Sequence, residues 1–266
     1  MAQRVRRYWR SLLSFWATSL EAELEYQLNL VIELLAVLGN LAGSVFVLVL
    51  LAGPSGELGG WSWNSALVVL GIYTVLDGFT SCVLQPNLSK IVSHVQNGTL
   101  DFVLLKPIDS QFWLSTRSFS PWGLPGVVAG IALIGWALAH NGEALSAGGL
   151  ALAMALLVAG GLILYSLWFL LAGLSIWFVK VWNATEVLRY TLVAGRYPIS
   201  AYPPALRLVF TLVLPVAFLT TVPAEALLGR ASAAWALGSL AAAAISLVGT
   251  RLFWRFALRH YTSASS

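Results

Sequence analysis

Two acidic residues, Glu33 and Asp77, lie inside long apolar runs of this sequence, where ionisable side chains are rare. Each lies about seven residues from one end of its run, so both carboxylates would be roughly 10 Å deep in a membrane helix. Asn40 lies nearer the middle of the first run, where a polar side chain typically forms hydrogen bonds between helices. Glu33, Asn40 and Asp77 together are the candidate substrate path. Two interpretations stay open for the acids. They form a shared site for a cationic amphipathic substrate, or they have a structural role, through hydrogen bonds to other helices or pairing with Arg7 or Arg10.

The elements that must position these residues are membrane helices. Of the 266 residues, 59% are hydrophobic and 10% are charged, whereas soluble domains carry about a quarter charged residues. Each span needs roughly 20 apolar residues. The sequence therefore predicts an all-α integral membrane protein with one transmembrane domain over residues 1–266. The six expected spans are 26–52, 65–84, 119–139, 150–179, 208–222 and 234–253.

The basic residues predict how the bundle faces the membrane. With six crossings, 14 of the 15 Lys and Arg residues fall on one side and only Arg230 on the other. They lie in the N-terminal region, in the loops 85–118 and 180–207, and at the C-terminus. Cytoplasmic segments carry such an excess. We therefore expect cytoplasmic termini and a multi-pass protein of the inner (plasma) membrane of a bacterial cell.

The first 25 residues have the pattern of an amphipathic helix. Large apolar side chains recur at helical spacing behind a basic start, namely Trp9, Leu12, Leu13, Trp16 and Leu20 after Arg4, Arg6, Arg7 and Arg10. Such a helix lies in the membrane plane or against a partner protein. It lacks the short apolar core and cleavage site of a secretory signal, so no cleavage is expected.

The fifth apolar run, 208–222, is short and contains Pro215, which removes a backbone donor and kinks a helix. Two structures fit the pattern equally well: a simple short span, or a kinked helix followed by a re-entrant piece buried in protein. Elsewhere, two glycine pairs predict close approach of helices, Gly39 with Gly43 and Gly126 with Gly130.

The stretch 85–110 is the best candidate for contact with another protein. Leu88, Ile91, Val92 and Val95 follow the spacing of a short amphipathic helix. A start near Pro86–Asn87 and a stop near Asn97–Gly98 frame it. The helix either docks onto a partner or rests on lipid.

Three blocks of this sequence resemble the exporter permeases of the ABC-2 family. The first is the run from Asn97 to Ile108, which is similar to the family signature G-x-L-D-x-x-L-x-[KR]-P-[IV]. The second is Arg196-Tyr-Pro-Ile with Tyr202-Pro203, and the third runs from Leu214 through Pro223 to Gly229. The blocks occur in the family's order, and the N-terminal helix and six spans extend the resemblance over nearly the whole chain.

The resemblance implies an ATP-driven exporter of two six-span permeases, the same or related chains, above two cytosolic ABC ATPase subunits. It implies an N-terminal elbow helix on the cytoplasmic leaflet, re-entrant helices after span five, and a coupling helix at about Asn87–Gln96 that docks into the ATPase. The docking residues implied are Asn87, Leu88, Lys90, Ile91, Val92, His94, Val95, Gly98, Asp101, Lys106 and Pro107.

The sequence contains no Walker A motif, no H-E-x-x-H, no Cys/His cluster and no G-x-S-x-G. We therefore expect no catalytic residues, no metal and no cofactor on this chain, with ATP and Mg²⁺ bound by the partner ATPase. Membrane lipid, and not nucleic acid, is the expected contact of its basic residues. The alternative is an ATP-independent secondary transporter or channel in which Glu33 and Asp77 relay protons or cations; a membrane scaffold is a third.

Overall fold

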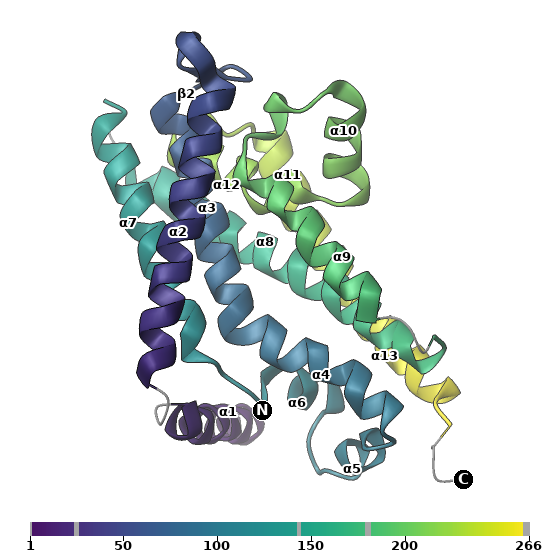
Figure 1. Cartoon of the computed structure of the whole chain (residues 1–266). Coiled ribbons are helices and arrows are strands. Elements are labelled where there is room, and N and C mark those ends of the chain that lie inside the picture. The colour runs from purple at the N-terminus through teal and green to yellow at the C-terminus, as the bar shows by residue number, and fades with distance from the viewer. Residues whose placement is uncertain (1, 24–26, 143–144, 179–181, 263–266) are drawn as a thin grey trace.

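The computed structural model is a bundle of helices, and it describes residues 2–23, 27–142, 145–178 and 182–262 (Figure 1). Within these ranges five helices are long and apolar enough to cross a membrane, or up to six if one bent pair counts as a span. The five are Leu28–Ala52, Trp63–Gln96, Pro121–His140, Ala147–Ile176 and Ala233–His260. The chain is thus a multi-pass membrane protein. Glu143 and Lys180, which contributed to the expected charge pattern, lie outside the described residues.

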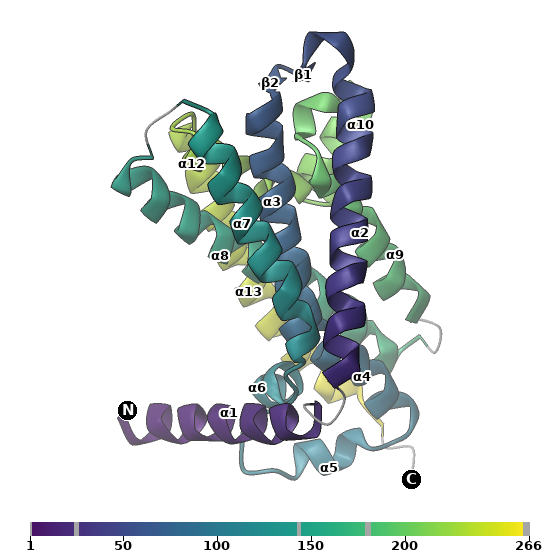
Figure 2. The same ribbon diagram turned by 60° about the vertical axis from the view of Figure 1, so that its left-hand side comes forward.

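The bundle has two distinct ends. At one, α1 (Ala2–Glu23) lies across the end of the bundle, crosswise to α2 (Gln27–Ala52), as Figure 2 shows. This is the α1 end. At the other, η1 (Gly53–Ser55) leads into β1 (Glu57–Leu58) and β2 (Trp61–Ser62), which pair antiparallel. The two strands are joined by Gly59 and Gly60, whose φ angles of 58° and 82° suit a two-residue hairpin turn. This is the hairpin end.

One continuous helical rod, Trp63–Gln96, runs from the hairpin end to the α1 end. It consists of α3 (Trp63–Phe79), the π-helical turn η2 (Thr80–Leu84) and α4 (Gln85–Gln96). A π turn inserts an extra residue into a helix without breaking it. The predicted docking helix is therefore a direct extension of a spanning helix, and no flexible loop separates the two.

Beyond α4 the chain folds back along the α1 end. Gly98, with φ of 67°, stands just after α4, and α5 (Leu100–Leu104) and α6 (Ser110–Thr116) follow. The Asp109 side chain caps α6 by accepting a hydrogen bond of 3.0 Å from the Phe112 N–H. The short η3 (Pro121–Gly123) then leads into α7 (Leu124–His140).

Helices α3 and α7 meet along glycines. A Cβ atom added at Gly78 would lie 2.6 Å from the backbone nitrogen of Val127, and one at Gly130 would lie 2.7 Å from the carbonyl oxygen of Gly71. The close approach predicted at Gly126 and Gly130 is confirmed. By contrast, a Cβ at Gly39 or Gly43 would meet nothing within 4 Å. The predicted approach at that pair does not occur within the described chain.

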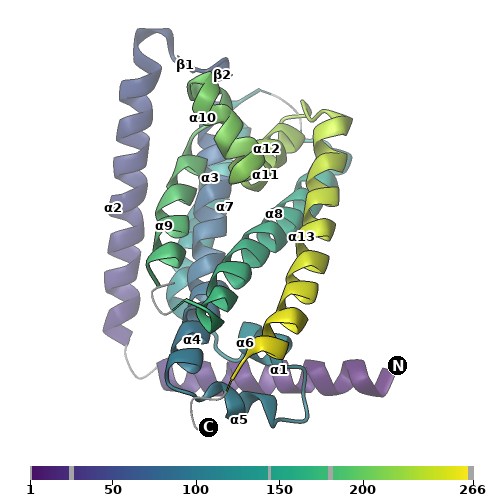
Figure 3. The ribbon, with the colours of Figure 1, turned by 90° about the vertical axis from the view of Figure 1, so that its right-hand side faces the viewer.

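The second half of the core is formed by α8 (Ala147–Gly173) with η4 (Leu174–Ile176), and by α13 (Ala233–His260). Trp168, Phe169 and Trp254 are almost completely buried between them, and the rings of Phe169 and Trp254 meet edge-to-face at 5.2 Å. Both helices approach the α1 end at their C-termini (Figure 3).

The segment 180–207 differs from its prediction as a loop on the α1 side. It contains α9 (Trp182–Leu192) and η5 (Val193–Arg196), which run from the α1 end toward the hairpin end (Figures 1 and 3). In η6 (Ile199–Ala201), the Ser200 hydroxyl donates a 2.7 Å hydrogen bond to the Gly59 carbonyl of the hairpin. The predicted side is therefore wrong for Arg196 and Arg207. Glu186 and Arg189 make α9 too polar to stand out as an apolar run.

The predicted span 208–222 is wrong as a single helix. It is divided among α10 (Pro204–Leu208), η7 (Val209–Val213), α11 (Val216–Leu219) and α12 (Thr221–Leu227). The chain bends by 69° at Leu214–Pro215, because proline lacks the donor that would continue the helix.

Both ends of this bent pair lie at the hairpin end. Arg207 donates to the carbonyl of Ser200 at 2.7 Å, the Ile199 N–H donates to the Thr221 hydroxyl at 3.2 Å, and a Cβ added at Gly149, at the start of α8, would lie 3.0 Å from the Ala226 carbonyl. The segment thus enters and leaves the bundle at one end, as in the re-entrant alternative. α9 is not among the helices long and apolar enough to cross a membrane, but α1 and the C-terminus of α13 lie at the same end of the bundle (Figure 3).

Candidate functional site

Glu33, Asn40 and Asp77, which lie far apart in the sequence, line one cleft of about 180 Å³. Its walls are α2 and α3, with Arg189 reaching in from α9. Further polar side chains face the same space, namely Ser44, Tyr73, Thr74 and Ser81. The depth that the sequence assigned to the two acids thus brings them into a common polar cleft within the apolar bundle.

The charge balance of the cleft differs from the expected acidic site. The cations that act on Asp77 are Arg189 and Arg196, and Arg196 also lies 5.1 Å over the ring of Tyr73. Two cations from α9 and η5 thus act on this carboxylate, and the Arg7 side chain, one of the partners proposed for it, lies outside the described side chains. Sequence reasoning missed them because both arginines had been assigned to a loop outside the membrane.

A smaller cavity of about 30 Å³ continues from the cleft toward the re-entrant helices. Tyr73, Asp77 and Arg189 line both spaces, while Val216 and Thr220 close the smaller one. The Thr220 hydroxyl is buried there without a hydrogen-bond partner among the described residues. This cavity has room for only about one or two water molecules, so it is a constriction at the end of the cleft near Thr220.

The apolar stripe of the predicted docking helix faces inward. Leu88, Ile91 and Val92 in α4 are at most 2% exposed, so their side chains stabilise the bundle. Asn87 is equally buried: its amide donates to the carbonyls of Val83 and Ser118 at 2.7 Å and accepts from the Ser118 N–H at 2.8 Å. Within this chain these four side chains pack against the bundle, and their predicted role as docking contacts stays a prediction. Helical periodicity identifies an apolar face but not what covers it.

Other residues of the predicted docking set lie in the segment 90–107, which contains the end of α4 and all of α5 and is called the α4–α5 tip. Lys90, Lys106 and Pro107 are exposed, while His94, Val95, Gly98 and Asp101 are partly buried. Phe102 and Leu105, which sequence reasoning had not selected, are 68% and 81% exposed. Exposed apolar side chains at one end of a bundle fit a contact with another protein or with lipid, the two alternatives that the sequence left open.

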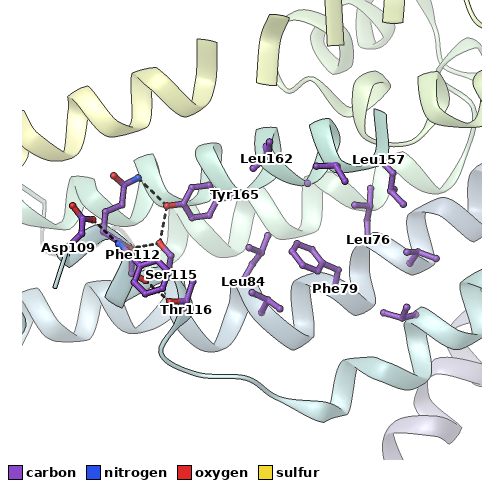
Figure 4. A pocket seen from close by; sticks show the side chains of 16 residues that line it. Leu76, Phe79, Leu84, Asp109, Phe112, Ser115, Thr116, Leu157, Leu162 and Tyr165 are labelled. Atoms are coloured by element: carbon purple, nitrogen blue, oxygen red, sulfur yellow. Dashed lines mark hydrogen bonds between the residues drawn. The ribbon is translucent and has the colours of Figure 1, made fainter. Parts of the chain in front are cut away.

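A second, larger cavity of about 670 Å³ was not predicted (Figure 4). Its apolar part is lined by α3, η2, α7 and α8, with Leu76, Phe79, Leu84, Leu157 and Leu162 among the side chains drawn in Figure 4. Its polar end is formed by α6 and Tyr165. The Tyr165 hydroxyl is 3.1 Å from the Gln111 amide and 2.9 Å from the Ser115 hydroxyl. Because these residues come from distant segments, no local pattern indicates the cavity.

An ion pair stands at the polar end of that cavity. The guanidinium of Arg251 donates from Nη1 to Asp109 Oδ1 and to Gln111 Oε1, each at 3.0 Å, and from Nη2 to Asp109 Oδ2. Partial burial alone would raise the pKa of Asp109, but the hydrogen bonds from Arg251 and the Phe112 N–H outweigh it and lower that pKa below its ordinary value.

Among the described residues no group of three or more His, Cys, Asp or Glu side chains could hold a metal ion. Cys82 is a free, buried thiol.

The long apolar helices and the bent helix pair are those of a multi-pass membrane protein. The family model of the ABC-2 family transporter proteins matches residues 38–265, which is most of the chain. The chain therefore belongs to the ABC-2 family, and it is a membrane component of an ABC transporter. Comparisons with curated proteins and with solved structures gave no match.

Proposed function

We propose that this chain is the membrane-spanning permease subunit of an ATP-driven exporter, which moves a hydrophobic or amphipathic substrate outward. ATP and Mg²⁺ bind to a separate cytosolic ATPase subunit, and this chain carries no catalytic residue. The observation that supports this most directly is the family match over residues 38–265, combined with the exposed apolar tip at Phe102 and Leu105.

The α1 end faces the cytoplasm in this proposal. The arginines at the start of α1, the lysines of 85–118 and the three arginines Arg251, Arg255 and Arg259 all belong to it. Arg207 and Arg230 belong to the hairpin end and Arg196 lies inside the bundle over the Tyr73 ring, so the asymmetry is weaker than the sequence suggested but keeps its direction. In this orientation α1 is the elbow helix, with Trp9 and Leu13 exposed to lipid and Trp16 held by its hydrogen bond of 3.2 Å to the Thr116 carbonyl.

The docking surface is the α4–α5 tip. Phe102 and Leu105 supply apolar contact area, and Lys90 and Lys106 supply charge at its rim. A movement of the tip is passed directly to the spanning helix, because α4 continues through η2 into α3 and no loop separates them. The glycine contact between α3 and α7 then makes these two helices move together.

The polar cleft is the proposed substrate path. Glu33, Asn40 and Asp77 line it with Arg189, so it offers both signs of charge and hydrogen-bonding groups to an amphipathic molecule. A second permease, identical or related, would cover the open face of α2, where a Cβ added at Gly39 or Gly43 would meet nothing within 4 Å in the described part of the chain. The substrate would leave past the constriction at Thr220 toward the hairpin end.

The test is reconstitution with the ATPase expressed from the same operon or genome neighbourhood. Co-purification and ATP-dependent transport in proteoliposomes are expected for the unmodified chain. The double variant Phe102→Asp/Leu105→Asp should abolish co-purification, since charges cannot enter an apolar contact without large cost. Thr18→Asp, an exposed change on α1, is the matched control. Transport driven by an ion gradient without any ATPase would contradict the proposal and favour the secondary transporter.

A further inference from the structure

The cavity of about 670 Å³ beside α8 is separate from the proposed substrate path. None of its lining residues belongs to α2 or α9, whereas the polar cleft is built from α2, α3, Gly123, Gly126 and Arg189. It therefore calls for an occupant of its own.

The cavity opens toward the hydrocarbon of the membrane. Val158 and Phe79 on its rim are 59% and 38% exposed, and they adjoin the exposed apolar side chains Val128 and Met154 of α7 and α8. Between Leu157 and Tyr165 the α8 wall extends over about 12 Å along the helix axis. An apolar space of this kind does not hold water. An acyl chain from the surrounding lipid is the molecule that would fill it without exposing a polar group.

The polar end of the cavity lies at one end of the bundle and carries hydrogen-bonding groups: Asp109 and Gln111 line it, and Arg251, bonded to both, lies just behind the lining and balances the Asp109 charge. Tyr8 of α1 packs its ring on Phe112 at 4.8 Å and its hydroxyl accepts from the Asp109 N–H at 3.4 Å, so the cavity ends at the level of α1. The three hydrogen bonds of Arg251 to Asp109 and Gln111 use three of the five N–H donors of an arginine. Its side chain remains 38% exposed. Arginine with free donors at a membrane interface is a phosphate-binding group.

We propose that this cavity binds one acyl chain of a bilayer phospholipid, whose phosphate lies against the guanidinium of Arg251. The chain lies between α3, α7 and α8, and the glycerol reaches the hydroxyls of Ser115 and Tyr165. Such a lipid fills the gap between α8 and the α3–α7 pair, so it acts as a structural part of the subunit.

Gly161 allows a precise test. It lines the cavity, and a Cβ added there would meet only the Phe79 ring, at 3.9 Å. A Gly161→Leu side chain would therefore enter the space of the acyl chain without striking backbone. Gly135 and Gly249 are matched controls, because a Cβ at either would meet nothing within 4 Å and neither lines the cavity.

The measurement is native mass spectrometry of the full chain, purified in detergent and titrated with dioleoyl phosphatidylglycerol. The unmodified chain, Gly135→Leu and Gly249→Leu should retain one tightly bound phospholipid, and Gly161→Leu should lose it. Val158→Trp, which blocks the rim, should lose it as well and serves if Gly161→Leu does not fold. Arg251→Gln should weaken phosphatidylglycerol binding about tenfold, the loss of one charge-assisted hydrogen bond, and should leave dioleoylglycerol binding unchanged.

Equal lipid retention by Gly161→Leu, Val158→Trp and the controls would overturn the proposal. So would the release, by Gly161→Leu, of a molecule other than a phospholipid, because the cavity would then hold transported cargo. Competition by inorganic phosphate alone, with no dependence on the acyl chain, would also contradict it.

Discussion

Arg251 of α13 and Asp109 at the start of α6 form an ion pair although 142 residues separate them. The pair joins the C-terminal spanning helix to the segment that follows the proposed docking tip. A second bond runs parallel to it, since the Trp254 indole donates to the Ser110 hydroxyl at 3.1 Å. Any movement of α6 relative to the bundle must therefore break this connection or carry α13 along.

Replacing Asp109 by Asn should reduce thermal stability modestly and in a pH-dependent way. Both side chains are partly exposed, at 38% for Arg251 and 28% for Asp109, so the loss should be at most about 1 kcal/mol. The pKa of Asp109 is lowered in the folded chain. Its stabilisation is therefore present above the ordinary carboxyl pKa of about 3.9 and is lost as the pH falls through the lower folded value.

The measurement is the melting temperature in detergent between about pH 3 and pH 7. These values extend from about one unit below the ordinary carboxyl pKa to about three units above it. The difference between unmodified and Asp109→Asn chains should be largest at neutral pH and vanish in acid. Glu21→Gln, an exposed change on α1, is the control. A difference that does not vary with pH would show that the carboxylate charge is irrelevant.

Gly78→Ala should be strongly destabilising although it adds a single methyl group. The new Cβ would lie 2.6 Å from the Val127 backbone nitrogen, so α3 and α7 would have to separate, at a cost of about 1–3 kcal/mol. Gly135→Ala, on the same helix pair but in open space, should be neutral or slightly stabilising. Chemical denaturation followed by tryptophan fluorescence compares the two. Similar stabilities would mean that the two helices do not meet as closely as described.

Asp77 and Arg189 should be energetically coupled in transport. Asp77→Asn or Arg189→Gln alone leaves one charge of the cleft without its counterpart, whereas the double variant removes both. We expect the double variant to lose less transport than the sum of the single losses, with a coupling energy of about 0.5–3 kcal/mol. Initial rates in proteoliposomes, normalised to the amount of folded protein, give this value. Additive losses would separate the two residues, and unchanged transport with lower stability would assign them a structural role.

Ser200 and Ser93 should be accessible from opposite sides of the membrane. Ser200 lies beside the hairpin through its bond to Gly59, and Ser93 is exposed on α4. Single cysteines at these positions, in a chain whose own Cys82 is buried, can be labelled with a membrane-impermeant maleimide. Right-side-out vesicles should label Ser200→Cys and inverted vesicles Ser93→Cys. Labelling of both from the cytoplasmic side would restore the topology first expected for residues 180–207.

The sequence predicted the spanning helices whose apolar runs are uninterrupted, and it failed where polar groups are paired inside the bundle. The sequence did not predict α9 as a helix of the bundle, because Glu186 and Arg189 lower the mean hydropathy of this segment. Arg189 is tolerated there because it lines the same cleft as Asp77. Pro215 correctly marked the break that makes the fifth run re-entrant. In α4 the period of Leu88 and Ile91 was read correctly as a helix, but only tertiary packing decides whether such a stripe meets the bundle or a partner.

The same limit applies to the candidate sites. The depths of Glu33 and Asp77 could be inferred by counting residues along each run, so their meeting in one cleft was foreseeable. The cations that complete the cleft could not be, since their positions depend on the unexpected position of α9. The lipid-facing cavity depends on how far α8 stands from α3 and α7, which no residue spacing encodes.

The π turn at Thr80–Leu84 fixes how far α4 is rotated about the helix axis relative to α3. Each residue of an α-helix turns the following segment by about 100°. Deleting one residue from η2 would therefore rotate α4 about its axis, carry Leu88 and Ile91 out of the bundle and turn polar side chains of α4 inward. The length of this turn, more than the identity of its side chains, sets the direction in which the tip points.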